Sequence, residues 1–117
     1  MGTKVLVVED NPSLLNMLGL TFRSSGYSTV LCPNAEAVLE RVHNERPDAI
    51  VCDVNLPGMA GTQFTDFVKL SPRLADTPVI LKSAYSEPRE HLADAFVSKP
   101  FDPMEMVQVI EELVSSD

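Results

Sequence analysis

The chain has 117 residues, of which 44% are hydrophobic and 22% charged, so we expect one globular domain over residues 1–117. Its formal net charge of −8 argues against direct nucleic-acid binding, which requires a basic face. It has no signal peptide and no apolar run of the roughly 18 residues that span a membrane, so we expect a soluble cytoplasmic protein with no membrane contact.

The first half of the chain predicts two strands, each followed by a helix. The apolar run Lys4–Val8 has strand length, and Asn11-Pro12 then supplies a cap and a proline at the first helical position. Gly26 can end this helix, and a second strand is expected over Ser28–Leu31. Asn34 caps a second helix, whose predicted inward face is Ala35, Val38, Leu39 and Val42.

The second half predicts three more strands and two clear helices. The expected strands are Ala49–Cys52, Pro78–Leu81 and Ala95–Val97, and most of the apolar runs are continuous, as in strands covered on both faces. Gly61 opens a third helix, and the capping-box pattern Asp102–Glu105 opens the last. The inward residues expected on these helices are Phe64, Phe67, Val68, Met106, Val107, Ile110 and Leu113.

This alternation of strands and helices predicts the fold class. Strands separated by helices at this spacing form a parallel sheet with helices on both faces. We therefore expect an α/β, doubly wound, five-stranded parallel sheet of flavodoxin-like strand order 2-1-3-4-5. Cys32 and Cys52 lie in or beside strands, so we expect core thiols and no zinc site.

Polar residues follow four of the predicted strands. Glu9 and Asp10 follow the first strand, Asp53 the third, Ser83 the fourth and Lys99 the fifth. The carboxyl ends of parallel strands share one edge of the sheet, and ligands bind there where the strand order reverses. The sequence therefore predicts that these side chains converge on one crevice.

The residue types in this crevice suit phosphoryl transfer. Three nearby carboxylates repel one another, and a divalent cation relieves that repulsion. Oxygen ligands without neighbouring Cys or His favour Mg²⁺. A carboxylate nucleophile, a metal ion, a lysine and a hydroxyl group are the parts that phosphoryl transfer uses to position groups and neutralise charge.

Four motifs at these strand ends resemble the response-regulator receiver domain of two-component signalling, which is CheY-like. They are "VLVVEDNP" with Glu9 and Asp10, "VCDVNLPGMAG" with Asp53, "PVILKSA" with Ser83 and "FVSKPF" with Lys99. The resemblance spans nearly the whole chain, and the order of the motifs makes it specific although each alone is weak.

The resemblance implies a phosphoacceptor and a metal site. Asp53 would accept a phosphoryl group from a sensor histidine kinase or a phosphotransfer protein as an acyl phosphate. Asp10 would bind Mg²⁺ directly, and Glu9 largely through water. Asp53 and the backbone carbonyl of Asn55 would complete the protein ligands. The domain would be a signalling phosphoacceptor rather than an enzyme, and its only chemistry would be self-phosphorylation and self-dephosphorylation.

The resemblance also assigns catalytic, switch and lifetime roles. Lys99 would bind one phosphoryl oxygen and Ser83 would swing in to bind another, while Phe96 would turn inward with Ser83 as the switch aromatic. The Lys99–Pro100 bond is expected to be cis. Asn55 and Tyr85 would flank the path of the hydrolytic water, where Asn55 could orient that water and Tyr85 could shield the acyl phosphate. Our hypothesis is that Tyr85 restrains hydrolysis.

The sequence departs from the family between Ser83 and Lys99. The two lie 16 positions apart, and the family usually has about six more residues there, roughly one and a half helical turns. We therefore expect a short or irregular fourth helix, or only a loop, with Leu92 where the family commonly has glycine. This puts in doubt the usual dimer formed by the last two helices and the strand between them. Lys82 replaces an apolar residue and is expected to extend its amine to solvent.

Other interpretations remain beside this one. A phosphohydrolase of the haloacid-dehalogenase kind would need an Asp where Asn55 stands, and flavodoxin or P-loop phosphate motifs are not found. A receiver-like interaction module that does not use phosphate is the third alternative. His43 and His91 are expected at the surface. Whether an output domain lies beyond residue 117 stays open, as do the kinase and the stimulus.

Overall fold

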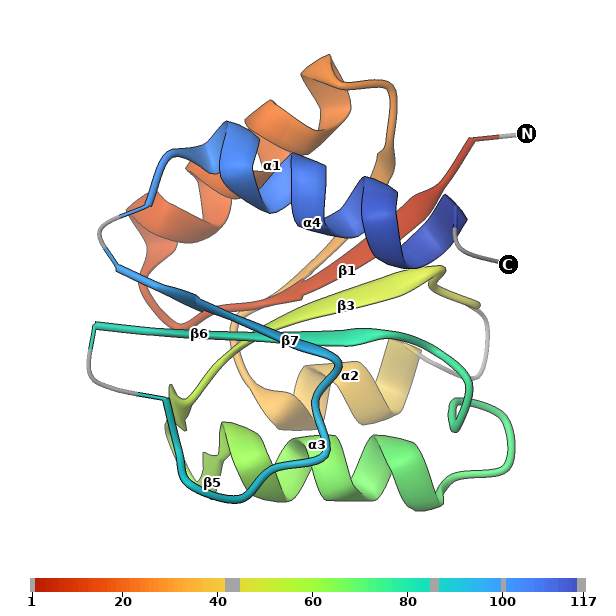
Figure 1. Cartoon of the computed structure of the whole chain (residues 1–117), viewed down its shortest axis with the longest axis vertical. Coiled ribbons are helices and arrows are strands. Elements are labelled where there is room, and N and C mark those ends of the chain that lie inside the picture. The colour runs from red at the N-terminus through yellow and green to blue at the C-terminus, as the bar shows by residue number, and fades with distance from the viewer. Residues whose placement is uncertain (1, 42–44, 85–86, 100, 116–117) are drawn as a thin grey trace.

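The computed structural model describes residues 2–41, 45–84, 87–99 and 101–115, and it contains a five-stranded parallel sheet with helices on both faces (Figure 1). The strand order is β2-β1-β3-β6-β7, which confirms the predicted order 2-1-3-4-5. A two-stranded antiparallel hairpin, β4 and β5, follows β3. The strands are β1 (Lys4–Val8), β2 (Ser28–Cys32), β3 (Ala49–Asp53), β4 (Asn55–Leu56), β5 (Met59–Ala60), β6 (Val79–Ser83) and β7 (Ala95–Ser98).

The helices form two layers. Figure 1 shows α1 and α4 above the sheet and α2 and α3 below it, so each face of the sheet has its own core. The described residues hold four helices, namely α1 (Pro12–Ser24), α2 (Ala35–Arg41), α3 (Gly61–Leu70) and α4 (Pro103–Ser115). All five residues of β3 are buried, as expected of a strand covered on both sides.

The predicted helix caps are confirmed by hydrogen bonds at three helix starts. The side-chain oxygen of Asn11 accepts the Leu14 N–H at 3.1 Å, and that of Asn34 accepts the Ala37 N–H at 2.8 Å. At α4, the Asp102 carboxylate accepts the Met104 N–H at 2.9 Å, and the Glu105 carboxylate accepts the Asp102 N–H at 3.2 Å. These bonds satisfy backbone donors that a helix leaves without partners in its first turn.

Two residues expected on inward helix faces are at the surface instead. Leu39 of α2 is 40% exposed and Phe67 of α3 is 43% exposed. Both line an apolar pocket of about 80 Å³ between the two helices and the β4–β5 hairpin. The inward stripe of each helix is one residue narrower than its apolar spacing predicts, because Val38, Phe64 and Val68 already cover the sheet beneath α2 and α3. Val42 lies outside the described residues.

The segment between β6 and β7 is irregular, which confirms the expected loss of a regular fourth helix. No helix occurs within residues 87–94, which run past α3 as a loop (Figure 1). Asp94 anchors the end of this loop, since one of its oxygens accepts the Val79 N–H and the Lys69 ammonium group, both at 2.8 Å. Leu92 is exposed, and no described non-glycine residue has a positive φ, so Leu92 forms no left-handed cap.

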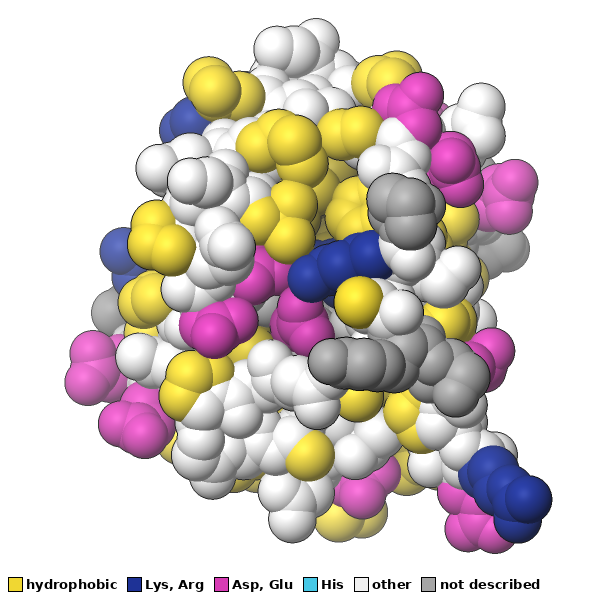
Figure 2. Space-filling view, turned by 90° about the vertical axis from the view of Figure 1, so that its left-hand side faces the viewer, with side chains coloured by type: hydrophobic (Ala, Val, Ile, Leu, Met, Phe, Trp, Pro, Cys, Tyr) yellow, Lys and Arg dark blue, Asp and Glu magenta, His cyan; other side chains and the backbone are white. Residues whose placement is uncertain are grey.

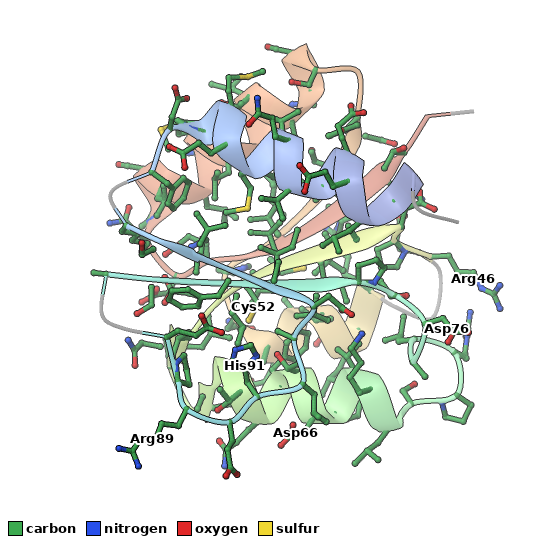
Figure 3. All side chains as sticks on the ribbon, in the orientation of Figure 1. Arg46, Cys52, Asp66, Asp76, Arg89 and His91 are labelled. Atoms are coloured by element: carbon green, nitrogen blue, oxygen red, sulfur yellow. The ribbon has the colours of Figure 1, made fainter. Side chains whose placement is uncertain are left out.

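The expectation that His91 lies at the surface is wrong. Its side chain is only 11% exposed, and its Nε2 lies 2.6 Å from a carboxylate oxygen of Glu87. In Figure 3 Arg89 points away from the molecule, whereas His91 lies on the inner side of the loop. The loop therefore turns a histidine inward in the space beside α3. His43 lies outside the described residues.

Both cysteines are free and buried, as expected. Burial raises the pKa of the Cys52 thiol, and it also raises that of Cys32. Neither thiol is therefore a good nucleophile in the folded state. Among the helices of the described residues, none is both long and apolar enough to cross a membrane.

Candidate functional site

Strand alternation brings four charged residues to one corner of the sheet. Side chains two positions apart on a strand share a face, and the aliphatic residues Val7, Val51, Ile80 and Val97 all belong to the core beneath α1 and α4. The residues two positions after them are Glu9, Asp53, Lys82 and Lys99. Figure 2 faces the side of the molecule where these strands end, and it shows acidic and basic side chains meeting near the centre.

Asp53 lies at the centre of this group and is 5% exposed. Its Oδ1 accepts the Asn55 backbone N–H at 3.0 Å. Its Oδ2 accepts from the Lys99 ammonium group at 2.9 Å and lies 3.3 Å from that of Lys82. The strand therefore delivers a carboxylate that two ammonium groups and one amide hold in place.

Glu9 is the second carboxylate of the pocket and is almost fully buried. Its Oε2 accepts the Asn11 N–H at 2.8 Å, so the start of α1 fixes its position. Its Oε1 forms an ion pair with Lys82 and lies 3.8 Å from the Lys99 Nζ. Glu9 and Asp53 are thus joined through the same two lysines.

Lys82 overturns the expectation that its amine reaches solvent. Its side chain is fully buried, and its ammonium group contacts the carboxylates of Glu9 and Asp53. Lys82 is the direct neighbour of Asp53 in the β3–β6 register, so both side chains leave the sheet on the same face. Because the Lys82 side chain has no exposed surface, the two carboxylates stabilise its ammonium group in place of solvent.

The pKa of Asp53 is lowered by this environment. Burial acts to raise it, but the Asn55 N–H and the ammonium groups of Lys99 and Lys82 stabilise the charged form and outweigh burial. The carboxylate is therefore ionised at neutral pH, which is the form that a nucleophile requires.

The remaining predicted site residues lie around this pocket. Asp10 and Asn55 are exposed beside Glu9 and Asp53. Ser83 is buried, and by alternation it lies on the face of β6 opposite to Lys82. Its backbone carbonyl accepts the Lys99 N–H at 2.7 Å, which fixes the start of the lysine-bearing loop. Phe96 is half-buried against the core beneath α2 and α3.

Two expectations fall on residues that the structure does not describe. They are the role of Tyr85 in hydrolysis and the cis bond before Pro100.

The donor atoms of the expected Mg²⁺ site fit the ion in kind. Carboxylate and carbonyl oxygens are the ligands that Mg²⁺ prefers, and the pocket and its rim supply them. However, the Lys82 ammonium group already contacts two of the carboxylates. Within the described ranges, no group of three or more His, Cys, Asp or Glu side chains is arranged to hold a metal ion. The ligand chemistry thus suits Mg²⁺, whereas the positive charge of Lys82 opposes it.

Gly61 is a positioning residue that the sequence did not single out for this role. A Cβ atom at Gly61 would lie 2.2 Å from the Asp53 carbonyl oxygen and 2.8 Å from the Val54 Cα. Its N–H donates to the Val54 carbonyl at 2.7 Å. Only glycine allows the start of α3 to approach the end of β3 this closely. The "NLPGMAG" stretch could have indicated this role, because a glycine at the start of a helix often allows another backbone segment to approach closely.

Comparison with known proteins agrees with the observed fold. A family model of the response regulator receiver domain matches residues 5–111. The phosphate regulon transcriptional regulatory protein PhoB of Klebsiella pneumoniae is 28% identical over 97% of this chain, and the chain spans about half (52%) of that relative.

Two solved structures share the fold over nearly their whole lengths. The first is a putative response regulator from Chloroflexus aurantiacus, with a TM-score of 0.91, 27% identity, and coverage of 98% of this chain and 99% of that one. The second is the receiver domain of the sensor histidine kinase PA1611 from Pseudomonas aeruginosa, with a TM-score of 0.88, 25% identity, and coverage of 99% and 100%. That structure holds a magnesium ion in its active-site cleft.

Proposed function

Because this chain belongs to the response regulator receiver domain family of two-component signalling, we propose that Asp53 is its phosphoacceptor. Receiver domains of this family are signalling phosphoacceptors. The observation that carries the assignment is the 2.9 Å contact between the Asp53 carboxylate and the Lys99 ammonium group, at the end of a buried central strand. This contact supplies an ionised oxygen nucleophile beside a fixed positive charge.

In the proposed reaction, a carboxylate oxygen of Asp53 attacks the phosphorus of a phosphohistidine on a sensor kinase or phosphotransfer protein. The P–N bond breaks and an acyl phosphate forms, while the histidine nitrogen leaves with the electron pair of that bond. Lys99 stabilises charge on the transferred group, and the Ser83 hydroxyl group swings in from the end of β6 to donate a further hydrogen bond. Beyond this self-phosphorylation and self-dephosphorylation, in which water attacks the phosphorus and releases inorganic phosphate and the Asp53 carboxylate, we propose no enzymatic activity.

We assign the Mg²⁺ ligands of the proposed site to Asp10, Asp53 and the Asn55 carbonyl oxygen, with Glu9 acting through water. When bound, the ion would neutralise charge on the phosphoryl oxygens. The support for this assignment is the oxygen-donor chemistry of the crevice and the exposure of Asp10 and Asn55 at its rim.

The proposed output is a conformational switch. Phosphorylation biases Ser83, Phe96 and the adjoining loops between two arrangements, and the new arrangement controls a partner or an output domain. The support for this role is the position of Phe96 on β7, half-buried against the core beneath α2 and α3 and three residues before Lys99. Asn55 and Tyr85 set the lifetime of the acyl phosphate in this proposal. The loop at residues 87–94 provides no helix for the dimer surface that is usual in the family.

Incubation with acetyl phosphate and Mg²⁺, followed by intact-protein mass spectrometry, tests the phosphoacceptor. We expect the wild type to gain one phosphoryl group and Asp53→Asn to gain none, because an amide is not a nucleophile for this reaction. Asp66→Asn is the matched control, since Asp66 is an exposed carboxylate on α3 (Figure 3). Phosphorylation of Asp53→Asn, or none in the wild type, would contradict the proposal.

A second candidate is a receiver-like interaction module that does not use phosphate. The contacts of Lys82 favour it, because this ammonium group lies against both Glu9 and Asp53, where the proposed Mg²⁺ site would need their negative charge. The same mass measurement separates the two candidates, because an unmodified wild type is the result that this alternative requires.

A further inference from the structure

The buried lysine in the Asp53 pocket has no role in the proposed reaction. Lys82 has no exposed side-chain surface, and its ammonium group contacts Glu9 and lies 3.3 Å from Asp53. The second lysine of the pocket, Lys99, is partly exposed: 26% of its side chain is accessible, and it reaches the same Asp53 oxygen from the rim. The pocket therefore contains one lysine that solvent reaches and one that it does not.

The charges of these four groups cancel. Two carboxylates, Glu9 and Asp53, face two ammonium groups, Lys82 and Lys99, so their formal sum is zero. A divalent cation usually enters an acidic pocket because the pocket has excess negative charge. Here the two lysines neutralise the two buried carboxylates, so that only Asp10 at the rim leaves a single negative charge to attract the ion.

We propose that Lys82 is a built-in counter-cation that weakens the binding of Mg²⁺ to the Asp53 pocket. The inference rests on the proposed function only for the assignment of Mg²⁺ to this pocket. An ion that binds Asp53 must either approach the Lys82 ammonium group closely or displace it from the carboxylates. Both routes cost free energy, because the repulsion is poorly screened in a buried site and a displaced ammonium group would remain buried without partners.

The position of Lys82 in the sheet makes displacement difficult. It belongs to β6 and pairs with Asp53 of β3, so its backbone is fixed directly beside the carboxylate that it neutralises. Its stem is enclosed, and the backbone carbonyl of Lys82 accepts the Val54 N–H at 2.9 Å. Lys99 differs, because it follows β7 at the rim and can turn toward solvent without leaving a buried charge.

Calorimetric titration of Mg²⁺ into the wild type and into Lys82→Met tests the inference. Methionine keeps the unbranched length of the side chain and removes the charge. We expect Mg²⁺ to bind Lys82→Met about tenfold more tightly or better, because a charge a few ångströms from a divalent ion is worth at least that factor in a partly desolvated site. An unchanged or weaker affinity overturns the proposal.

Lys4→Met is the matched control. Lys4 begins β1, at the end of the sheet away from the pocket, and its ammonium group pairs with Glu45 at 2.6 Å. Its removal changes the net charge by the same amount as Lys82→Met. We expect its Mg²⁺ affinity to stay within about twofold of the wild type, because salt screens charges at that separation. A rise equal to that of Lys82→Met would assign the effect to net charge and overturn the proposal.

A second pair of variants keeps the test valid if Lys82→Met fails to fold because Glu9 and Asp53 lose their contacts with the Lys82 ammonium group. Glu9→Gln removes one of those carboxylates, and Glu9→Gln/Lys82→Met removes one charge of each sign. We expect the double variant to bind Mg²⁺ more tightly than Glu9→Gln, by a factor similar to that of the single change. Equal affinities of these two variants count against the proposal.

The titration is independent of phosphoryl transfer, so the two proposals can fail separately. If acetyl phosphate does not modify Asp53 while Lys82→Met binds Mg²⁺ more tightly, the phosphoacceptor assignment fails and the role of Lys82 stands. If Asp53 is modified while the affinity for Mg²⁺ does not respond to Lys82, the role of Lys82 fails and the phosphoacceptor assignment stands.

Discussion

Tyr27, the residue just before β2, links this strand to α4 through its hydroxyl group. The hydroxyl donates to a carboxylate oxygen of Glu111 at 2.8 Å, and the ring packs against Phe22 with centroids 6.3 Å apart. Burial, with the hydrogen bond and the charge of Glu111, raises the pKa of Tyr27 to about 12 from an ordinary value of 10.0. The folded state therefore holds the phenolic proton more tightly than the unfolded state does.

This pKa predicts a loss of stability at high pH. Because the folded pKa is the higher one, the contribution of Tyr27 is fully present below pH 10 and is lost as the pH rises toward about 12. Tyr27→Phe should cost about 1 kcal/mol at neutral pH through the lost hydrogen bond. Urea denaturation of both proteins across this pH range checks the prediction, and their stability difference should shrink with rising pH. A constant difference would contradict it.

Most of the pocket could be predicted from the residues that follow each strand, whereas the position of Lys82 could not. Asp53 and Lys99 meet as expected because parallel strands end at a common edge. Lys82 lies inside a strand, and its contacts depend on the register that places it beside Asp53. The sequence shows which side chains of one strand share a face but not the register between strands, so it does not predict that Lys82 meets Asp53 rather than solvent.

At the scale of elements, the junction between β3 and α3 determines where Asp53 lies. The absence of a Cβ at Gly61 lets the helix start against the Asp53 carbonyl oxygen. Thr65 strengthens the first turn, because its hydroxyl group donates to the Gly61 carbonyl at 2.8 Å. The helix and the strand therefore act as one unit in holding the carboxylate.

We predict that Gly61→Ala destabilises the protein by about 1–3 kcal/mol or more, because the added methyl group meets backbone atoms that cannot rotate away. Chemical denaturation measures the loss. Gly2→Ala is the control, since its Cβ would lie 3.4 Å from the Gly26 carbonyl oxygen, an ordinary contact. Equal stability of Gly61→Ala and the wild type would show that the junction relaxes freely.

The loop at residues 87–94 depends on Asp94 for its attachment. Its carboxylate accepts the first N–H of β6, from Val79, and the Lys69 ammonium group of α3. Asp94→Ala should therefore lower the free energy of unfolding by about 1–3 kcal/mol, since it leaves the partly buried Val79 N–H without its acceptor and the Lys69 ammonium group with only the Thr77 carbonyl. Thermal denaturation beside Asp76→Ala, which changes an exposed carboxylate before β6, measures the effect. Equal losses in both variants would refute the attachment.

For the whole molecule, the order of elements was enough to predict the sheet. Alternating strands and helices allow few arrangements, because crossovers between parallel strands are almost always right-handed. The flavodoxin-like strand order was predicted with the fold class, and the short or irregular fourth helix was predicted from the family that the chain resembles, which usually has about six more residues between Ser83 and Lys99. The exposure of Leu39 and Phe67 was not, because each helix buries a narrower stripe than its apolar residues suggest.

The enclosed thiol of Cys52 makes the core of this protein accessible to a kinetic experiment. Cys52 immediately precedes Asp53, has no exposed surface, and donates its S–H to the Asp53 carbonyl oxygen at 3.3 Å. A thiol-specific reagent can reach it only while β3 is transiently detached from its neighbours. In a Cys32→Ser background, the rate of alkylation therefore reports how often the central strand opens, in a chain that contains no tryptophan for fluorescence.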